Sequence, residues 1–205
     1  MTEVVEPKKI TLTDAMRLRF KGVLDPIAAF LNRLGLMPNT ITLLGLLGNM
    51  VAVYFLWRGN MTIGGLIILA VGPIDALDGA MARLRGMPTQ FGAFVDSVTD
   101  RYSDLLMLGG LLMFYAGQAN QLAVGLAYAA AVGTVLVSYT RARAQSLGIE
   151  TKIGMLSRLE RYIVLVPALI LNFPIVALWI MAIFTNITAL QRIWDVRRQF
   201  HNGTR

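Results

Sequence analysis

Apolar residues run in six blocks along this chain, and each block is close to the length of a membrane-crossing helix. The blocks lie at residues 39–57, 62–83, 91–116, 121–143, 156–172 and 174–193. A helix needs about 20 mostly apolar residues to cross the hydrocarbon core of a bilayer. Short polar or glycine-containing breaks separate the blocks, such as Arg58-Gly59-Asn60. The pattern predicts an all-α integral membrane protein with six transmembrane helices.

The segment before the first block has a different pattern. Residues 1–10 are polar, and we expect them to be disordered, whereas residues 11–35 are expected to form an amphipathic helix bent at Pro26. One side of this helix is apolar, with Leu12, Met16, Val23, Ile27, Phe30 and Leu34. The other side is basic, with Arg17, Arg19, Lys21 and Arg33. This pattern is typical of a helix that lies in the membrane interface, and a soluble helix packed on the membrane domain is the alternative.

Basic residues are distributed unevenly between the two sides of the predicted bundle. Of the 19 Lys and Arg, six precede the first block, two follow the second, five follow the fourth and four are in the tail. The opposite side has only Arg58, and Arg101 lies within a block. Because basic residues mark the cytoplasmic side, we expect a cell-membrane protein with both termini in the cytoplasm. The membrane domain would span residues 36–195, followed by a basic cytoplasmic tail at 196–205.

The composition limits the chemistry that the chain can perform. Among 205 residues there is no cysteine, and the single histidine, His201, is in the tail. Cysteine nucleophiles, disulfides and thiolate metal sites are therefore excluded, and a histidine-based triad has almost no material. The net charge of +7 suits an anionic membrane surface better than nucleic acid, because most basic residues flank apolar blocks. A metal would need oxygen ligands, which favours Mg²⁺ or Mn²⁺.

Four aspartates interrupt the second and third apolar blocks. They follow the pattern Asp75-x-x-Asp78-Gly79-x-x-Ala82-Arg83, then eight residues, then Gly92-x-x-x-Asp96-x-x-x-Asp100. A carboxylate at the centre of a bilayer costs about 2.5 to 3.5 kcal/mol on the insertion scale, so four together need compensating cations. Helical spacing places each pair of aspartates on one helix face. If the two helices are antiparallel neighbours, the four carboxylates converge near the cytoplasmic face and can hold two divalent ions that clamp a pyrophosphate.

Two other polar features have simpler explanations. Asp104 is expected to pair with Arg101 on the same helix, and its participation in a site is left open. The stretch from Pro38 to Thr42 opens the first block, where a Thr or Asn side chain is expected to cap the helix.

Residues 75–100 resemble the signature of the CDP-alcohol phosphatidyltransferase family in every fixed position and every gap. The six membrane helices and N-terminal interfacial helix of that family also fit the whole chain. The resemblance implies two Mg²⁺ ions, with Mn²⁺ as an alternative, and displacement of CMP from a CDP-linked lipid. It makes Asp75, Asp78, Asp96 and Asp100 metal ligands, and Asp100 also the general base. Gly79, Ala82 and Gly92 would line the cytidine pocket of CDP-diacylglycerol, with Arg83 on the diphosphate, and members often have a stretch like Pro38–Thr42 near the nucleotide.

A basic region further along the chain bears on the second substrate. It comprises Ser138-Tyr139-Thr140-Arg141-Ala142-Arg143-Ala144, Ser157-Arg158-Leu159-Glu160-Arg161 and Arg192. Guanidinium groups bind phosphate bidentately, although each arginine could instead be a membrane-surface anchor. The pattern resembles the phosphatidylinositol-phosphate synthase branch, which implies that Arg141, Arg158 and Arg192 hold the phosphate of inositol 1-phosphate.

The match to this branch has two departures. Arg141 stands where the branch has lysine, and Ser157 and Leu159 stand where it has glutamate and proline. Glycerol 3-phosphate, another phosphorylated polyol, is therefore the runner-up acceptor.

Functions of other classes predict different features. A transporter would have acidic residues at mid-membrane and two related halves, and the sequence has neither. A non-catalytic lipid-binding scaffold would not need Asp96 and Asp100 intact. The resemblance also implies a homodimer, for which Gly109 and Gly110 offer a close-packing point, with ordinary helix packing as the equal alternative.

Overall fold

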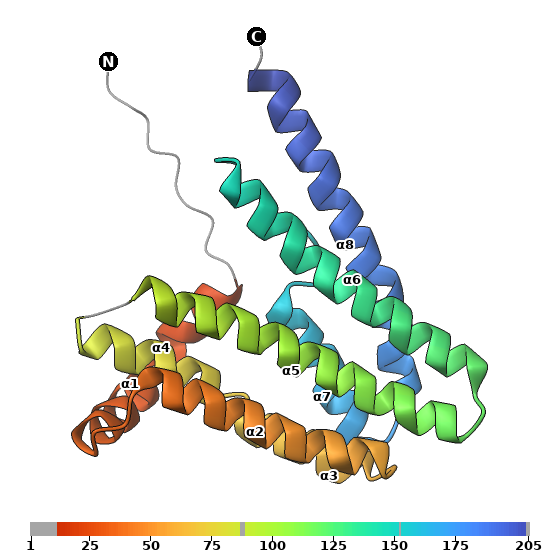
Figure 1. Ribbon diagram of the computed structural model, residues 1–205, viewed down its shortest axis with the longest axis horizontal. Helices are drawn as coiled ribbons and strands as arrows, with labels where there is room; N and C mark the ends of the chain where they lie inside the picture. Colours follow the sequence, from red (N-terminus) through yellow and green to blue (C-terminus); the bar gives the residue numbers. More distant parts are fainter. Residues whose placement is uncertain (1–11, 87–88, 152, 204–205) are drawn as a thin grey trace.

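The computed structural model describes residues 12–86, 89–151 and 153–203, with side chains except at residues 12–18, 20, 21, 75, 202 and 203. This part of the chain is built from helices joined by short connections (Figure 1). They are α1 (Leu12–Arg33), α2 (Pro38–Trp57), α3 (Met61–Val71), α4 (Ile74–Leu84), α5 (Gln90–Gly117), α6 (Gln121–Ser146), α7 (Arg158–Ile170) and α8 (Pro174–Gly203). Residues 1–10, for which we expected disorder, lie outside the described residues.

Four helical segments of the described chain are long and apolar enough to cross a membrane. They are α2, the run Met61–Leu84 that contains α3 and α4, α6, and Pro174–His201 within α8. The third and fifth predicted spans do not meet the same criterion. Within α5 stand Asp96, Asp100, Arg101 and Asp104, and α7 has only 13 residues.

The second predicted span, 62–83, is covered by the helical run Met61–Leu84, which a two-residue turn divides into α3 and α4. α3 ends at Val71 and α4 begins at Ile74, with Gly72 and Pro73 between them. Proline lacks the backbone N–H that an α-helix interior requires, and its ring clashes with the preceding turn. The amide of Gly72 still donates to the Ile68 carbonyl at 2.9 Å, and the helix restarts when Ala76 donates to the Pro73 carbonyl at 3.0 Å. The acidic residues of α4 therefore lie on a segment that this break separates from α3.

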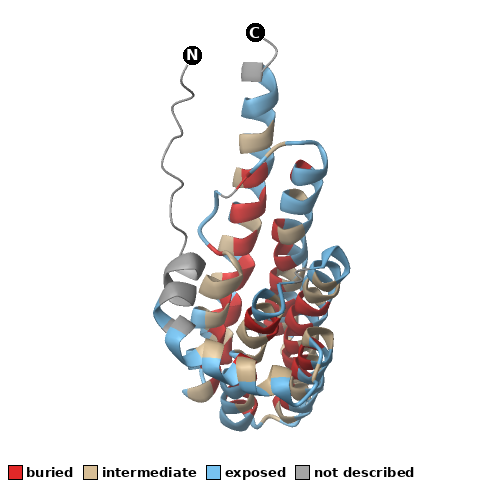
Figure 2. Ribbon diagram, turned by 90° about the vertical axis from the view of Figure 1, so that its left-hand side faces the viewer, coloured by how far each residue is buried: buried red, intermediate tan, exposed pale blue. Residues whose placement is uncertain are grey.

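The helices pack around one main core. α5 lies between α2 and α6, and α8 lies alongside α6 (Figure 1). α7 packs against α3 and α8. Buried residues line the contacts between helices, while the outward faces are exposed (Figure 2). Many of these exposed residues are large and apolar, such as Leu43, Leu47 and Val51 of α2, as expected for a surface that meets lipid.

Small residues allow several helices to approach closely. Gly133 of α6 lies against Thr185 and Asn186 of α8, so that a Cβ there would overlap their side chains. Gly110 of α5 faces Val53 of α2, where a Cβ would stand 3.0 Å from a valine methyl. Gly110 therefore serves helix packing within the chain, whereas a Cβ on Gly109 would meet nothing within 4 Å.

α1 is attached to α4 at one end of the molecule (Figure 1). Arg85 donates hydrogen bonds to the Asn32 side-chain oxygen at 2.7 Å and to the Leu36 carbonyl at 2.6 Å. The Asn32 amide donates in turn to the Met81 carbonyl at 3.2 Å. The helix runs through Pro26, and it buries Ala28 while a row of apolar side chains stays exposed. This row comprises Val23, Ile27, Phe30 and Leu34.

Candidate functional site

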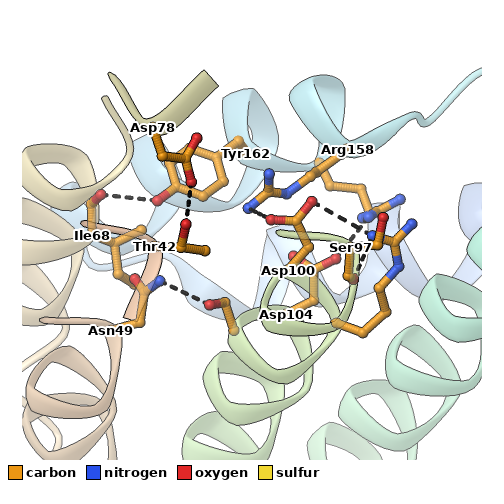
Figure 3. Close-up of polar contacts among 12 residues, drawn as sticks. Thr42, Asn49, Ile68, Asp78, Ser97, Asp100, Asp104, Arg158 and Tyr162 are labelled. Atoms are coloured by element: carbon orange, nitrogen blue, oxygen red, sulfur yellow. Dashed lines mark hydrogen bonds and ion pairs between the residues drawn. The ribbon is translucent and has the colours of Figure 1, made fainter. Parts of the chain in front are cut away.

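Asp78 is buried in α4 and is held by a hydroxyl from another helix. Only 6% of the residue is exposed, and Thr42 of α2 donates from Oγ1 to its Oδ2 at 2.5 Å (Figure 3). The Pro38 carbonyl lies 3.2 Å from the same hydroxyl oxygen and is its alternative acceptor. The residue before α2 is Met37, and no side chain caps this helix start. Our interpretation of Thr42 and its neighbours as caps was therefore wrong, since the hydroxyl orients the carboxylate of Asp78.

Asp100, the predicted general base, forms an ion pair with one of the predicted phosphate-binding arginines. Its Oδ1 is 2.7 Å from Arg158 Nη2 at the start of α7, and its Oδ2 is 3.5 Å from Arg101 Nη1 (Figure 3). Arg101 also donates to the Ser97 carbonyl at 2.7 Å. Asp100 is only 8% exposed, so the two guanidinium groups compensate a largely desolvated carboxylate.

Asp104 pairs with a residue that is distant in the sequence, which corrects our expectation of a pair with Arg101. Its Oδ2 lies 2.7 Å from Arg161 Nη2 of α7, and the two residues are 57 positions apart. A local partner was available at i−3, but Arg101 turns to Asp100 and to the Ser97 carbonyl instead. A long-range partner of this kind cannot be read from helical spacing.

The other two predicted metal ligands are only partly described. The side chain of Asp75 lies outside the described part, and Asp96 is half-buried on α5. Among the described side chains, no group of three carboxylates comes close enough to hold a metal ion. Because the side chain of Asp75 is not among them, the set of four ligands remains a prediction.

The two acidic helices both pack against a third helix, α2. We expected them to be direct neighbours, but both α4 and α5 pack against α2, and the main helix pairs of the described chain do not include α4 with α5. Thr42 of α2 contacts Asp78, and about two turns further along α2, Asn49 donates to Ser103 of α5 at 3.1 Å. α2 therefore carries a polar contact to each acidic helix.

Of the residues predicted to bind the nucleotide, Gly79 lies at the middle of α4, Ala82 and Arg83 near its end, and Gly92 near the start of α5. Arg83 is exposed and bends back over Gly79, where a Cβ would stand 3.4 Å from Arg83 Nη1. Gly92 donates its amide to Thr89 Oγ1 at 2.9 Å, and a Cβ on it would stand 3.5 Å from Asn39 Oδ1 of α2. Ala82 is half-buried. Because Gly79 and Gly92 have no side chain, polar groups of other residues can lie close to the backbone at these two positions.

The three predicted acceptor-binding arginines differ in their surroundings. Arg141 is exposed, and Arg158 is half-buried against Asp100. Arg192 is only 4% exposed and donates to the Val137 carbonyl at 2.5 Å and to the Ile153 carbonyl at 3.0 Å. Its charge interacts with those of Arg141, Arg161 and Glu160, so these three arginines form a basic cluster where α6 ends and α7 begins beside α8.

The connection from α6 to α7 is firmly attached to α8. Thr188 Oγ1 accepts hydrogen bonds from the amides of Met155 and Leu156, at 3.1 and 3.2 Å. Arg192 holds the Ile153 carbonyl, and Gln199 donates to the Glu150 carbonyl at 3.2 Å. These contacts fix the point at which α7 begins, and therefore the position of Arg158.

Sequence reasoning missed three contacts of this region. Thr42, Arg161 and Tyr162 all make long-range polar contacts, and Tyr162 donates its hydroxyl to the Ile68 carbonyl at 2.9 Å (Figure 3). The signal for Arg161 was available, because a second buried charge on α5 needs a partner. The signal for the Tyr162 contact was weaker, since nothing in the sequence shows that the end of α3 packs against α7.

The chain belongs to the CDP-alcohol phosphatidyltransferase family, whose model matches residues 35–190. It is 38% identical to the phosphatidylinositol phosphate synthase of Streptomyces avermitilis, over 93% of this chain and 84% of the relative. It is 35% identical to the archaetidylinositol phosphate synthase of Pyrococcus horikoshii, over 92% of this chain and 98% of the relative. The chain is accordingly a multi-pass membrane enzyme of the phosphatidyltransferase class.

Two crystal structures of the Mycobacterium tuberculosis phosphatidylinositol phosphate synthase have the same fold. The structure with CDP-DAG bound matches with a TM-score of 0.80 and 31% identity, over 85% of this chain and 93% of that chain. The structure in complex with manganese and citrate matches with a TM-score of 0.81 and 32% identity, over 84% of this chain and 88% of that chain. The predicted family is thereby confirmed, and the manganese complex supports a divalent metal as the cofactor class.

Proposed function

We propose that this protein transfers the phosphatidyl group of CDP-diacylglycerol to inositol 1-phosphate, releasing CMP and forming phosphatidylinositol phosphate. The observation that carries this proposal is the ion pair between Asp100 and Arg158, at 2.7 Å. It brings the predicted base and a predicted phosphate-binding cation together from two separate helices. An acceptor whose phosphate binds at Arg158 would hold its hydroxyl near the Asp100 carboxylate.

The acidic residues fit a divalent metal on chemical grounds. Asp78 and Asp100 are buried carboxylates, at 6% and 8% exposure, and a hard cation prefers such oxygen donors. Thr42 fixes one oxygen of Asp78 in the way that an outer hydrogen bond orients a ligand. Asp75, Asp78, Asp96 and Asp100 would hold two Mg²⁺ ions, or Mn²⁺ in their place. When bound, the metals would neutralise charge on the diphosphate and on departing CMP.

The transfer itself is a single displacement at phosphorus. The acceptor hydroxyl oxygen forms a bond to the phosphatidyl phosphorus, and the bond from that phosphorus to the oxygen of CMP breaks. Asp100 accepts the proton of the attacking hydroxyl as general base. Gly79, Ala82 and Gly92 make room for the cytidine, and Arg83 contacts the diphosphate. The chain offers no dedicated nucleophile for a two-step route, because it has no cysteine and its histidine is in the tail.

Two observations favour inositol 1-phosphate as the acceptor: the positive charge of three arginines and the names of the relatives. Arg141, Arg158 and Arg192 supply cations for a phosphate that free inositol or serine would lack. The Streptomyces and Pyrococcus relatives differ in the lipid part of their names, yet both names specify an inositol phosphate. Glycerol 3-phosphate would use the same cations, and it remains the runner-up.

The membrane arrangement follows from the same enzyme class. We propose six transmembrane helices, counting α3 with α4 as one, with both termini and the site on the cytoplasmic side of the cell membrane. The exposed apolar row of α1 supports an interfacial position, because the described part of the chain does not cover those side chains. A homodimer, implied by the family resemblance, completes the proposal.

The direct test is CMP release from CDP-diacylglycerol by the purified protein with Mg²⁺ and one acceptor at a time. The acceptors are inositol 1-phosphate, glycerol 3-phosphate, free inositol and serine. We expect rapid release with inositol 1-phosphate alone. Faster release with glycerol 3-phosphate would keep the chemistry and overturn the acceptor, and no release from folded protein in lipid would favour the scaffold.

A further inference from the structure

Two ion pairs join α5 to α7, one helical turn apart. The outer pair is Asp100 with Arg158, and the inner pair is Asp104 with Arg161, each with an N–O distance of 2.7 Å. The aspartates are spaced i, i+4 on α5 and the arginines i, i+3 on α7, so each pair of like charges lies on one face of its helix. The two pairs together define one register of α7 against α5.

The inner pair is more deeply buried than the outer one. The side chains of Arg161 and Asp104 are 5% and 10% exposed, against 34% for Arg158. A small pocket borders the inner pair, and apolar side chains such as Met107, Leu108 and Leu165 line it. A buried ion pair contributes little net stability compared with apolar side chains of similar size, and its best-attested use is to select one arrangement among several.

The arrangement selected here is the position of α7 along α5, which decides whether Arg158 lies beside Asp100 in the predicted site. If α7 moved outward by one turn, about 5.4 Å, Arg161 would face Asp100 and Arg158 would leave it. Asp104 would then be a buried carboxylate without its cation, which is strongly unfavourable. No such penalty exists if residue 104 is uncharged. A third contact, from the Tyr162 hydroxyl to the Ile68 carbonyl, holds the other side of α7 to α3.

We propose that Asp104 is a positioning residue, which through Arg161 holds α7 in the register that places Arg158 beside Asp100. Its effect on catalysis passes through Arg158, and it makes no contact with either substrate. The inference rests on the proposed function for its kinetic test, because the effect is read in the affinity for the phosphorylated acceptor.

The kinetic test is a double-mutant cycle of Asp104→Asn and Arg158→Gln. Alone, Asp104→Asn is expected to raise the KM for inositol 1-phosphate about tenfold, with the KM for CDP-diacylglycerol nearly unchanged. In the Arg158→Gln background the same substitution is expected to have almost no further effect on the acceptor KM. Equal effects in both backgrounds would overturn the proposal, because a merely structural residue acts independently of Arg158.

An apolar replacement separates positioning from stability. Asp104→Leu combined with Arg161→Leu fills the buried space without charges, and it is expected to keep the thermal stability of the parent protein. Its acceptor KM should nevertheless stay raised. A stable double variant with the parent acceptor KM would contradict the proposal. The matched control is Ser103→Ala, which removes a buried contact from α5 to Asn49 of α2 rather than to α7, and it should leave the acceptor KM unchanged.

A distance measurement tests the same inference without any activity. The chain has no cysteine, so Tyr102→Cys on α5 and Ile163→Cys on α7, both at exposed positions, give two unique sites for spin labels. Electron–electron resonance should give one narrow distance distribution in the otherwise unchanged protein. Asp104→Asn should broaden it or shift it by about 5 Å, one helical turn, whereas Ser103→Ala should not. An unchanged distribution in Asp104→Asn would overturn the inference, and an inactive parent protein would contradict only the proposed function.

Discussion

Thr42 of α2 donates a hydrogen bond of 2.5 Å to the carboxylate of Asp78 in α4, across 36 positions of the sequence. The bond fixes the orientation of a buried acidic side chain that is a predicted metal ligand. Loss of an outer hydrogen bond of this kind typically lowers metal affinity or activity about 10- to 100-fold.

Replacement of Thr42 by valine therefore tests the metal site. Thr42→Val keeps the shape of the side chain but removes the donor, and we expect the Mg²⁺ concentration for half-maximal activity to rise about 10- to 100-fold. Thr42→Ser should retain most of the affinity. The control is Thr40→Val, an exposed position on the same helix. An unchanged Mg²⁺ dependence in Thr42→Val would mean that Asp78 is not a ligand or does not need this bond.

The role of Asp100 as base predicts a loss of rate with retained folding. Asp100→Asn keeps the size of the side chain and removes the proton acceptor, so kcat should fall by about 10² to 10⁴. The loss should appear in CMP release and in lipid product alike. Thermal unfolding in detergent, compared with the parent protein, shows whether the variant is folded. A folded Asp100→Asn enzyme with more than a tenth of the parent rate would exclude this residue as the base.

Arg158 is expected to act on the acceptor and much less on the donor. Arg158→Gln removes a charge-assisted hydrogen bond worth about 1.5 to 3 kcal/mol, so the acceptor KM should rise about 10- to 150-fold. The matched control is Arg143→Gln, because Arg143 is exposed and contacts Ser146 of its own helix. Steady-state kinetics with each substrate varied in turn separates the two effects. A larger change in the KM for CDP-diacylglycerol would reassign Arg158 to the donor.

The connection before α7 should be sensitive to a single added methyl group. Gly154 has a φ of +134° and its missing Cβ would overlap the Thr188 methyl, so Gly154→Ala combines backbone strain with a clash. We expect a loss of about 1 to 3 kcal/mol in stability, together with a raised acceptor KM because α7 begins beside this point. The control is Gly148→Ala, since Gly148 also has a positive φ, +78°, but has open space around it. Equal losses in both variants would show that only backbone strain matters here.

Local pattern predicted the helices and the acidic motif well, because each depends on residues that are close in the sequence. Apolar block lengths placed α2, α6 and α8, and the aspartate spacing identified the family. The break at Gly72 and Pro73 was missed because both residues lie within a long apolar run. Only the Gly-Pro dipeptide indicates that the helix is interrupted there.

Contacts between distant helices could not be predicted in the same way. Arg161 as the partner of Asp104, Thr42 as the partner of Asp78, and the backbone carbonyls that engage Arg192 all depend on how helices pack. For Arg192 the sequence indicated a cation near the site, and the structure adds that one of its nitrogens bonds Ile153 in the connection before α7 and another bonds Val137 of α6. Its predicted role with the acceptor stays a prediction.

The most direct measurement of the central claim is a competition between two acceptors. Purified protein in lipid nanodiscs receives CDP-diacylglycerol, Mg²⁺ and equal concentrations of inositol 1-phosphate and glycerol 3-phosphate, and the lipid products are quantified by mass spectrometry. The product ratio equals the ratio of kcat/KM for the two acceptors. We predict phosphatidylinositol phosphate in large excess, with neither product formed by Asp100→Asn. An excess of phosphatidylglycerol phosphate would contradict the account.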